Sequence, residues 1–161
     1  MSNLLRPSDL DRLRRTMAQV YDESFFSSFR NLLRARLRLD TFLVMRFFRN
    51  TPPQLLFTWI GDADLNKKFP VNYVDGAYRL DPFFQFADLP PSGGMYRLSE
   101  IAPDRFFSGE YYLRYYRDTQ LRDEVGLLMP LSDGSIAHLS LSRLQKSGTF
   151  RGKELACLYH Y

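Results

Sequence analysis

Residues 121–143, LRDEVGLLMPLSDGSIAHLSLSR, constrain the fold most, because two strand-like runs flank a turn. Apart from Asp123, one side of the first run is apolar: Leu121, Val125, Leu127, Met129 and Leu131. The second run alternates Ala137, Leu139 and Leu141 with His138, Ser140 and Ser142, the period-two pattern of a half-buried antiparallel strand. Asp133-Gly134 predicts a two-residue hairpin turn, since both turn positions need positive φ. An isolated hairpin is marginally stable, so other segments must cover its apolar face.

The other segments alternate between helical and strand-like patterns. Apolar spacing predicts a helix after Ser8, with Ser8 and Asp11 as a capping box, and a second helix from about Ser24. Residues 41–49 and 54–60 predict another hairpin. Residues 62–118 predict a series of short helices with a short strand at 95–98, and a last helix begins near Phe150.

This order of elements predicts a single α+β domain over residues 1–161. Its core would be an antiparallel sheet of about five strands with helices on both faces, an α-β-α sandwich. The irregular middle segment, 62–118, would cross one face of the sheet and cover a pocket there.

Composition and charge narrow the function classes. The only cysteine, Cys157, excludes an internal disulfide and favours a reducing, cytoplasmic setting. No apolar run approaches the roughly 20 residues that span a bilayer, so no membrane partner is expected. The net charge of +4 is concentrated in the first 50 residues. This basic half indicates either a nucleic-acid or phospholipid partner, or solvated helix faces such as the one that carries Arg30, Arg34 and Arg38.

Signatures of catalysis are scarce in the sequence, so we expect no enzyme. It has no G-x-S-x-G elbow, no glycine-rich phosphate loop and no cysteine cluster, and predicts neither a cofactor nor a metal site. The histidines, His138 and His160, are far apart, and His138 should either face solvent or have a hydrogen-bond partner. Asp123 and Glu124 should point to opposite faces of a strand and form no catalytic pair.

Aromatic residues make up 16% of the chain and gather around the middle segment, where they either fill a core or line a cavity. Asp81, which precedes Pro82, either caps a helix or binds an amide N–H or an amine of a small ligand, and one carboxylate can do both. The candidate ligand-binding residues are Asp81, Tyr73, Trp59, Tyr78, Phe83, Tyr111 and Tyr115.

Two stretches, YVDGAYRLDPFF at 73–84 and GMYRLSEIAPDRFFSGEYYLRYYRDTQLRDEVGLLMPLSDGSIAHLSLSR at 94–143, resemble the N-terminal sensory half of LuxR-type transcription regulators of the solo type. The resemblance implies a GAF/PAS-like fold that binds a small-molecule signal and pairs with itself. In that family DNA is bound by a C-terminal helix-turn-helix domain. No such domain is present in this chain, whose end in mid-helix suggests an excised sensory domain.

The resemblance also implies roles for single residues. Asp81 falls where the family places the aspartate that contacts the amide N–H of the signal, and Tyr73 falls near a pocket tyrosine. The family's lactone-reading tryptophan should fall near Lys67 or Lys68 and is absent, which weakens the case for acyl-homoserine lactones. We therefore expect a sensory, homodimeric regulatory domain. The alternative is a ligand-free interaction platform that dimerises through the Arg30–Arg34–Arg38 face or the terminal helices.

Overall fold

The computed structural model describes residues 6–87 and 93–158, without the side chains of Lys67, Lys68, Phe107, Arg114 and Cys157. The chain divides into two compact units. The terminal unit comprises Met1–Leu39 with Phe150–Tyr161, and the sheet unit comprises Asp40–Thr149. That both units form one domain stays a prediction.

The terminal unit contains the helices α1 (Pro7–Met17), α2 (Phe25–Arg34) and α6 (Gly152–Leu158). In α1 the capping box is shifted from its predicted place, because the helix starts at Pro7, whose fixed φ suits the first helical position. Asp9, and not Asp11, accepts the backbone N–H of Arg6 at 2.9 Å. Asp9 is buried and also pairs with Arg36, whose Nε donates to it at 3.0 Å. Residues 159–161 of the predicted last helix lie outside the described residues.

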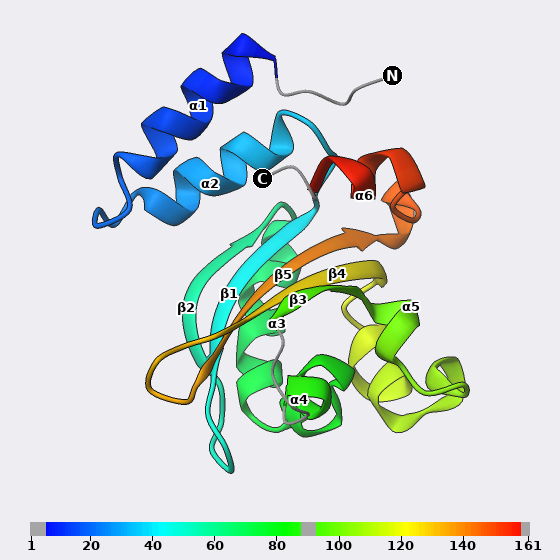
Figure 1. Cartoon of the computed structure of the whole chain (residues 1–161). Helices are drawn as coiled ribbons and strands as arrows, with labels where there is room; N and C mark the ends of the chain where they lie inside the picture. Colours follow the sequence, from blue (N-terminus) through cyan, green and yellow to red (C-terminus); the bar gives the residue numbers. More distant parts are fainter. Residues whose placement is uncertain (1–5, 88–92, 159–161) are drawn as a thin grey trace. The chain divides into compact units, whose positions relative to one another are not determined.

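The sheet unit is built on five antiparallel strands, which confirms the predicted α+β class (Figure 1). The strands are β1 (Thr41–Phe47), β2 (Gln54–Ile60), β3 (Gly94–Arg97), β4 (Leu121–Pro130) and β5 (Ile136–Leu144). Their order across the sheet is β2-β1-β5-β4-β3. The predicted strand near 95–98 is therefore present as an edge strand paired with β4.

The β4–β5 hairpin confirms the stretch that the sequence singled out, but its turn differs from the prediction. Leu131 N donates to Ser135 O at 2.8 Å, so the loop holds three residues, Ser132 to Gly134. Of these only Gly134 has positive φ, at +81°, as in hairpins whose third loop residue is a left-handed glycine. Asp133 does not take the left-handed position; its side chain instead accepts from the Ser135 hydroxyl at 2.6 Å and pairs with Arg46.

Burial along this hairpin also differs from the half-buried pattern. Every residue of β5 from Ala137 to Leu144 is buried, because β5 lies in the middle of the sheet. The side of the first run that was expected to be apolar is exposed toward the turn: Met129, in β4, and Leu131, just after it, are 38% and 39% exposed. Leu128, on the opposite side of the strand, joins the core.

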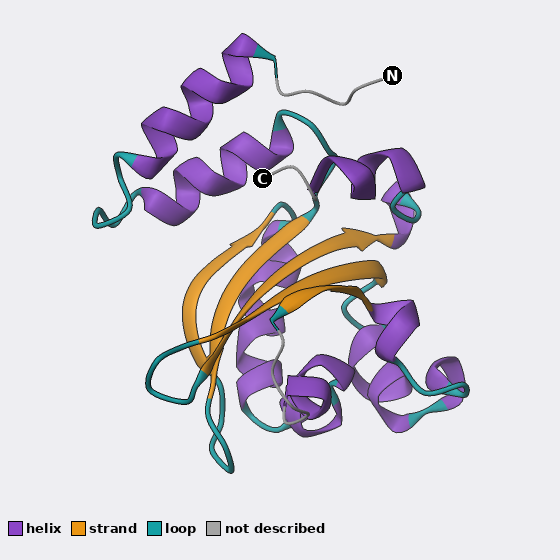
Figure 2. Ribbon diagram, in the orientation of Figure 1, coloured by secondary structure: helices purple, strands orange, loops and turns teal. Residues whose placement is uncertain are grey.

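The middle segment confirms the predicted run of short helices along one face of the sheet (Figure 2). Its elements are α3 (Ala63–Val74), η1 (Ala77–Leu80), α4 (Pro82–Ala87), α5 (Leu98–Ile101), η2 (Phe106–Ser108) and η3 (Tyr112–Tyr116); η4 (Gln145–Ser147) follows β5. Asp62 caps α3 by accepting the N–H groups of Asp64 and Leu65 at 3.2 and 3.4 Å. The tyrosine-rich residues of η3 form a π-helical turn.

Candidate functional site

Asp81 lies between η1 and α4 and is 3% exposed. Its Oδ1 accepts the backbone N–H of Phe83 at 2.8 Å, which is the capping role expected before a helix that starts with proline. Its Oδ2 accepts the hydroxyl of Tyr73, on α3, at 2.5 Å. The carboxyl is therefore anchored to two helices and held in the interior.

Burial sets the protonation of this pair. Desolvation raises the pKa of Asp81 to about 6, although the bonds from Tyr73 and Phe83 both favour the charged form. Burial, followed by the nearby Asp81 charge, raises the pKa of Tyr73 well above its usual value. Tyr73 therefore stays protonated at all ordinary pH values, and its hydroxyl donates a hydrogen bond to Asp81.

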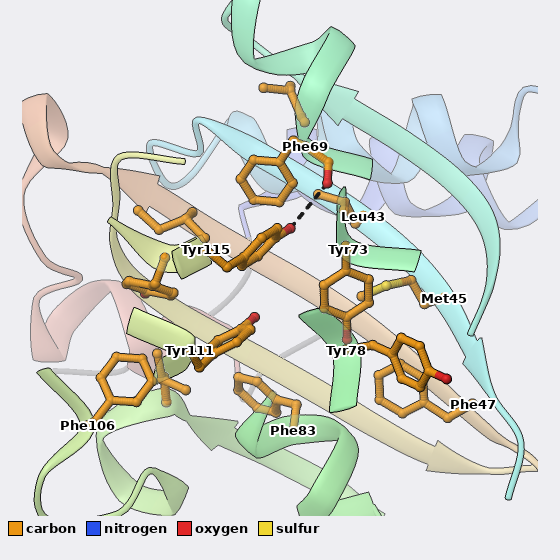
Figure 3. Close-up of a cluster of buried hydrophobic side chains, with 14 of the residues drawn as sticks. Leu43, Met45, Phe47, Phe69, Tyr73, Tyr78, Phe83, Phe106, Tyr111 and Tyr115 are labelled. Carbon is orange, nitrogen blue, oxygen red and sulfur yellow. Dashed lines mark hydrogen bonds between the residues drawn. The ribbon is translucent and has the colours of Figure 1, made fainter. Parts of the chain in front are cut away.

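Two tyrosines from the region of η3, Tyr111 and Tyr115, lie in the same cluster as Tyr73 (Figure 3). The rings of Tyr111 and Tyr115 stack with centroids 5.3 Å apart, and Tyr115 lies 5.7 Å from Tyr73. The Tyr115 hydroxyl donates to the carbonyl of Phe69 at 3.3 Å. The Tyr111 hydroxyl points into the middle of the cluster in Figure 3.

Glu124, on β4, is a second buried carboxyl that the sequence analysis did not assign to the site. Ser140 on β5 donates its hydroxyl to Oε1 at 2.6 Å. Desolvation, and then the charge of Asp81, raise the pKa of Glu124 to about 8, while the Ser140 bond opposes the shift. Strand alternation could have indicated that Glu124 faces the interior. It shares a face of β4 with Gly126 and Leu128, and Leu128 is in the core.

His138 is fully buried, so the expectation of a solvent-facing or hydrogen-bonded histidine is wrong. Among the described residues neither ring nitrogen has a hydrogen-bond partner. The ring stacks on Phe83 with centroids 4.8 Å apart and lies 5.0 Å from Phe47. Desolvation lowers its pKa to about 3, so the imidazole is neutral. The ring therefore packs against the site residue Phe83 and carries no charge.

The structure brings most of the predicted site residues together. Five share the region around the buried carboxyl: Asp81, Tyr73, Phe83, Tyr111 and Tyr115. Tyr78 joins the core, but its hydroxyl accepts from Arg79 at 3.3 Å and points away. Trp59 lies apart: it pairs across the strands with Phe42, whereas the core cluster takes the alternate residues Leu43 and Met45 from β1.

A separate pocket of about 300 Å³ lies where α5, η2 and η3 meet β4. Its lining includes Leu98, Phe106, Tyr116 and Arg122, and none of the predicted site residues. Across residues 6–87 and 93–158, histidines and acidic residues form no group of three that could hold a metal ion. Within the same ranges no helix combines the length and apolar character needed to cross a bilayer.

Comparison with solved structures confirms the fold suggested by the sequence. The chain superposes on the ligand-binding domain of VqsR from Pseudomonas aeruginosa with a TM-score of 0.81 and 21% identity, covering 96% of this chain and 90% of that one. Escherichia coli SdiA gives a TM-score of 0.55 at 15% identity over 94% of this chain and 61% of SdiA. SdiA in complex with octanoyl-rac-glycerol gives a TM-score of 0.55 at 16% identity, over 94% of this chain and 62% of that one. These neighbours are LuxR-type autoinducer-binding domains.

Among sequence relatives, a protein of Aeromonas salmonicida named as an HTH-type transcriptional regulator in the exeN 3′ region is 36% identical over 78 residues. The match spans 48% of this chain and 39% of that protein, so the two share less than half of their lengths. No family model matches the sequence. The relatives named here are regulators or ligand-binding domains, which fits the expectation that the chain is not an enzyme.

Proposed function

We propose that this chain, whose fold is that of the LuxR-type autoinducer-binding domains, is the small-molecule-sensing and dimerising regulatory domain of a transcription regulator. The buried pair of Asp81 and Tyr73 is the observation that supports sensing most directly. A carboxyl in a protein interior is costly unless it is well partnered, so its retention among aromatic side chains favours a functional role. Asp81 would accept an N–H group of the signal, and Tyr73, Phe83, Tyr111 and Tyr115 would surround it.

Sensing is tested by ligand-induced stabilisation. A compound that binds the folded chain at a hundredfold excess over its Kd stabilises it by about 2.7 kcal/mol, which raises Tm. The probes are octanoyl-rac-glycerol, which SdiA binds in its solved complex, and bacterial small-molecule extracts. We expect at least one probe to raise Tm in the parent chain and to do so less in Asp81→Ala.

The matched control is Asp118→Ala, which removes an exposed carboxyl outside both the Asp81 cluster and the lining of the pocket at α5, η2 and η3. It should respond like the parent chain. If no probe raises Tm, and mass spectrometry of the purified protein finds no retained compound, the chain is not a sensor and the ligand-free platform is the better description.

Pairing of two copies is proposed through α1. Leu10 and Met17 lie seven residues apart, on one face of the helix, and are 52% and 54% exposed. Exposed apolar side chains at this spacing favour contact with a second copy. Sedimentation should show a dimer that Met17→Glu dissociates. Arg34→Glu tests the alternative arginine face, of which Arg30 and Arg34 lie on α2 and Arg38 lies beyond the end of the helix. A monomer in the parent chain at high protein concentration would contradict pairing.

Contact with DNA would require a helix-turn-helix domain linked to this one, and the regulator would act in the cytoplasm. The Aeromonas salmonicida relative supports this arrangement, because its name assigns it to HTH-type regulators. Gel-shift titrations of this chain alone should therefore show weak binding that salt abolishes and that does not depend on DNA sequence.

A further inference from the structure

Glu124 gives the interior a second acceptor group that no cation neutralises. Its Oε1 accepts the Ser140 hydroxyl at 2.6 Å, and Oε2 provides a second acceptor on the same carboxyl. The groups that act on its charge are Asp81, Ser140 and Asp123, none of which is basic. Asp81 is satisfied only by Tyr73 and a backbone N–H. The charges of the two carboxyls therefore act on each other, and within the described residues the groups named above for either carboxyl include no basic side chain.

Tyr111 supplies an independent observation at the same place. Its side chain is 7% exposed, and its hydroxyl has no hydrogen-bond partner among the residues that the structure describes. It points into the middle of the cluster (Figure 3), where its electrostatic neighbours are Asp81, Tyr115, Tyr73 and Glu124. A hydroxyl that no described protein group engages can bind a polar group of a ligand at this place.

The chemistry of these groups selects the missing partner. Both carboxylates act only as acceptors when ionised, and the Tyr111 oxygen can accept as well. A protonated primary amine offers three N–H donors and one positive charge, and it forms charge-assisted hydrogen bonds with carboxylates. Aromatic faces such as those of Tyr73 and Tyr115 attract cations further. A neutral amide could satisfy Asp81 while Glu124 stays protonated, whereas a cation would also compensate the charge of an ionised Glu124.

We propose that the signal of this site is a small molecule with a protonated primary amine, which Glu124, Asp81 and Tyr111 bind. This inference rests on the proposed sensory function and specifies its ligand class. It assigns the decisive contact to Glu124, a residue of the strand β4, and leaves Asp81 with its capping bond to Phe83.

Proton linkage distinguishes a cation from a neutral ligand. The groups that hydrogen-bond to the two carboxyls or interact with their charges are Tyr73, Tyr111, Tyr115, Tyr116, Asp123 and Ser140. His138, which stacks on Phe83, is neutral. With the pKa of Glu124 at about 8, its carboxyl is mostly protonated at pH 7 in the free protein. An alkylammonium ion keeps its proton at this pH, so its binding should release about one proton from Glu124.

The experiment compares matched probes by calorimetry and thermal shift at pH 7. The basic probes are 2-phenylethylamine and octylamine, and each neutral control is the corresponding N-acetyl amide. We expect the amines to bind and the amides to bind at least about tenfold more weakly, since the amide loses the charge-assisted bonds. In buffers of different ionisation enthalpy the amines should release a proton, and their affinity should rise from pH 6 to pH 8.

The matched variant is Glu124→Gln, which keeps an oxygen for Ser140 and removes the charge. It should weaken amine binding at least about tenfold and leave the weak amide binding unchanged. Amides that bind as well as amines, or amine binding that Glu124→Gln does not affect, would overturn the inference and leave sensing intact. The proposed function itself fails if Tm is raised by none of the probes, that is, by no amine, no amide, no extract and not by octanoyl-rac-glycerol.

Discussion

The hydroxyl of Tyr73 donates to the carboxylate of Asp81 across 2.5 Å, in an interior that exposes neither side chain by more than 4%. This bond joins α3 to the start of α4, because the other oxygen of Asp81 caps α4 through the N–H of Phe83. The same carboxyl thus binds a side chain of α3, caps α4 and lies in the candidate site. Structure and proposed recognition depend on it together.

Tyr73→Phe should separate these two roles. The variant removes one donor from a buried carboxyl, so the free energy of unfolding should fall by about 1–3 kcal/mol. The pKa of Asp81 should rise further above its present value of about 6, because the Tyr73 bond favours the charged form. Urea unfolding at pH 7 measures the first effect. Tyr21→Phe, which alters a fully exposed tyrosine, is the control and should change the free energy by less than about 0.5 kcal/mol.

Glu124 should make the protein less stable as the pH rises. Its pKa is about 8 in the folded chain, against 4.5 as the ordinary value. The folded state therefore binds more protons than the unfolded state, and the free energy of unfolding should fall between these two pH values. Measurements from pH 6.5 to pH 8 avoid the titration range of most other groups. Over this range Glu124→Gln should flatten the slope and exceed the parent chain in stability at pH 8. A parent slope of zero would contradict the buried, uncompensated carboxyl.

His138 should have the opposite effect at acid pH. Its folded pKa is about 3 and its ordinary value is 6.5, so the unfolded state binds the extra proton. Stability should therefore be full above pH 6.5 and should fall as the pH drops toward 3. His138→Leu removes two unpaired ring nitrogens from a site that is 0% exposed. Chemical unfolding at pH 5 and pH 7 should show a smaller acid loss in this variant, and an equal loss would argue against a neutral buried imidazole.

The residues that sequence reasoning placed correctly depend on local chemistry. Asp81 was identified because a short polar side chain before proline is a helix start, and the bond to Phe83 spans only two residues. Glu124 and His138 were missed because their burial depends on which strands flank β4 and β5, and alternation alone does not say that both faces of β5 are covered.

Trp59 shows the same limit at one strand. The face of the sheet to which the Trp59 side chain points depends on the register between β2 and β1, and this register shifts between Val44 and Met45. A change of one residue moves a side chain to the opposite face, and nothing in the run 54–60 fixes this register. By contrast, the break between α3 and η1 has a local signal in the sequence, because it falls at Gly76, whose φ is +143°.

Gly126→Ala should disturb the packing of Phe83 and His138 at the candidate site, because it adds a methyl group between them and β4. A Cβ at Gly126 would lie 2.3 Å from Phe83 Cε1 and 2.6 Å from His138 Nε2. Both rings are buried and stack on each other, so neither can move without opening the core. Overpacking of this kind costs typically about 1–3 kcal/mol, and the displaced Phe83 would also pull its N–H from Asp81.

The control for this change is Gly152→Ala, since an added Cβ at Gly152 meets no atom within 4 Å. Alanine is also the better helix former, so at the first residue of α6 this variant should be neutral or slightly stabilising. Thermal unfolding of both variants, followed by titration with whichever probe stabilises the parent chain, measures the two effects. We expect Gly126→Ala to lower Tm and reduce the ligand response, because the Asp81 carboxyl loses its position. A Gly126→Ala variant with unchanged Tm would contradict the close packing of Phe83 and His138 against β4.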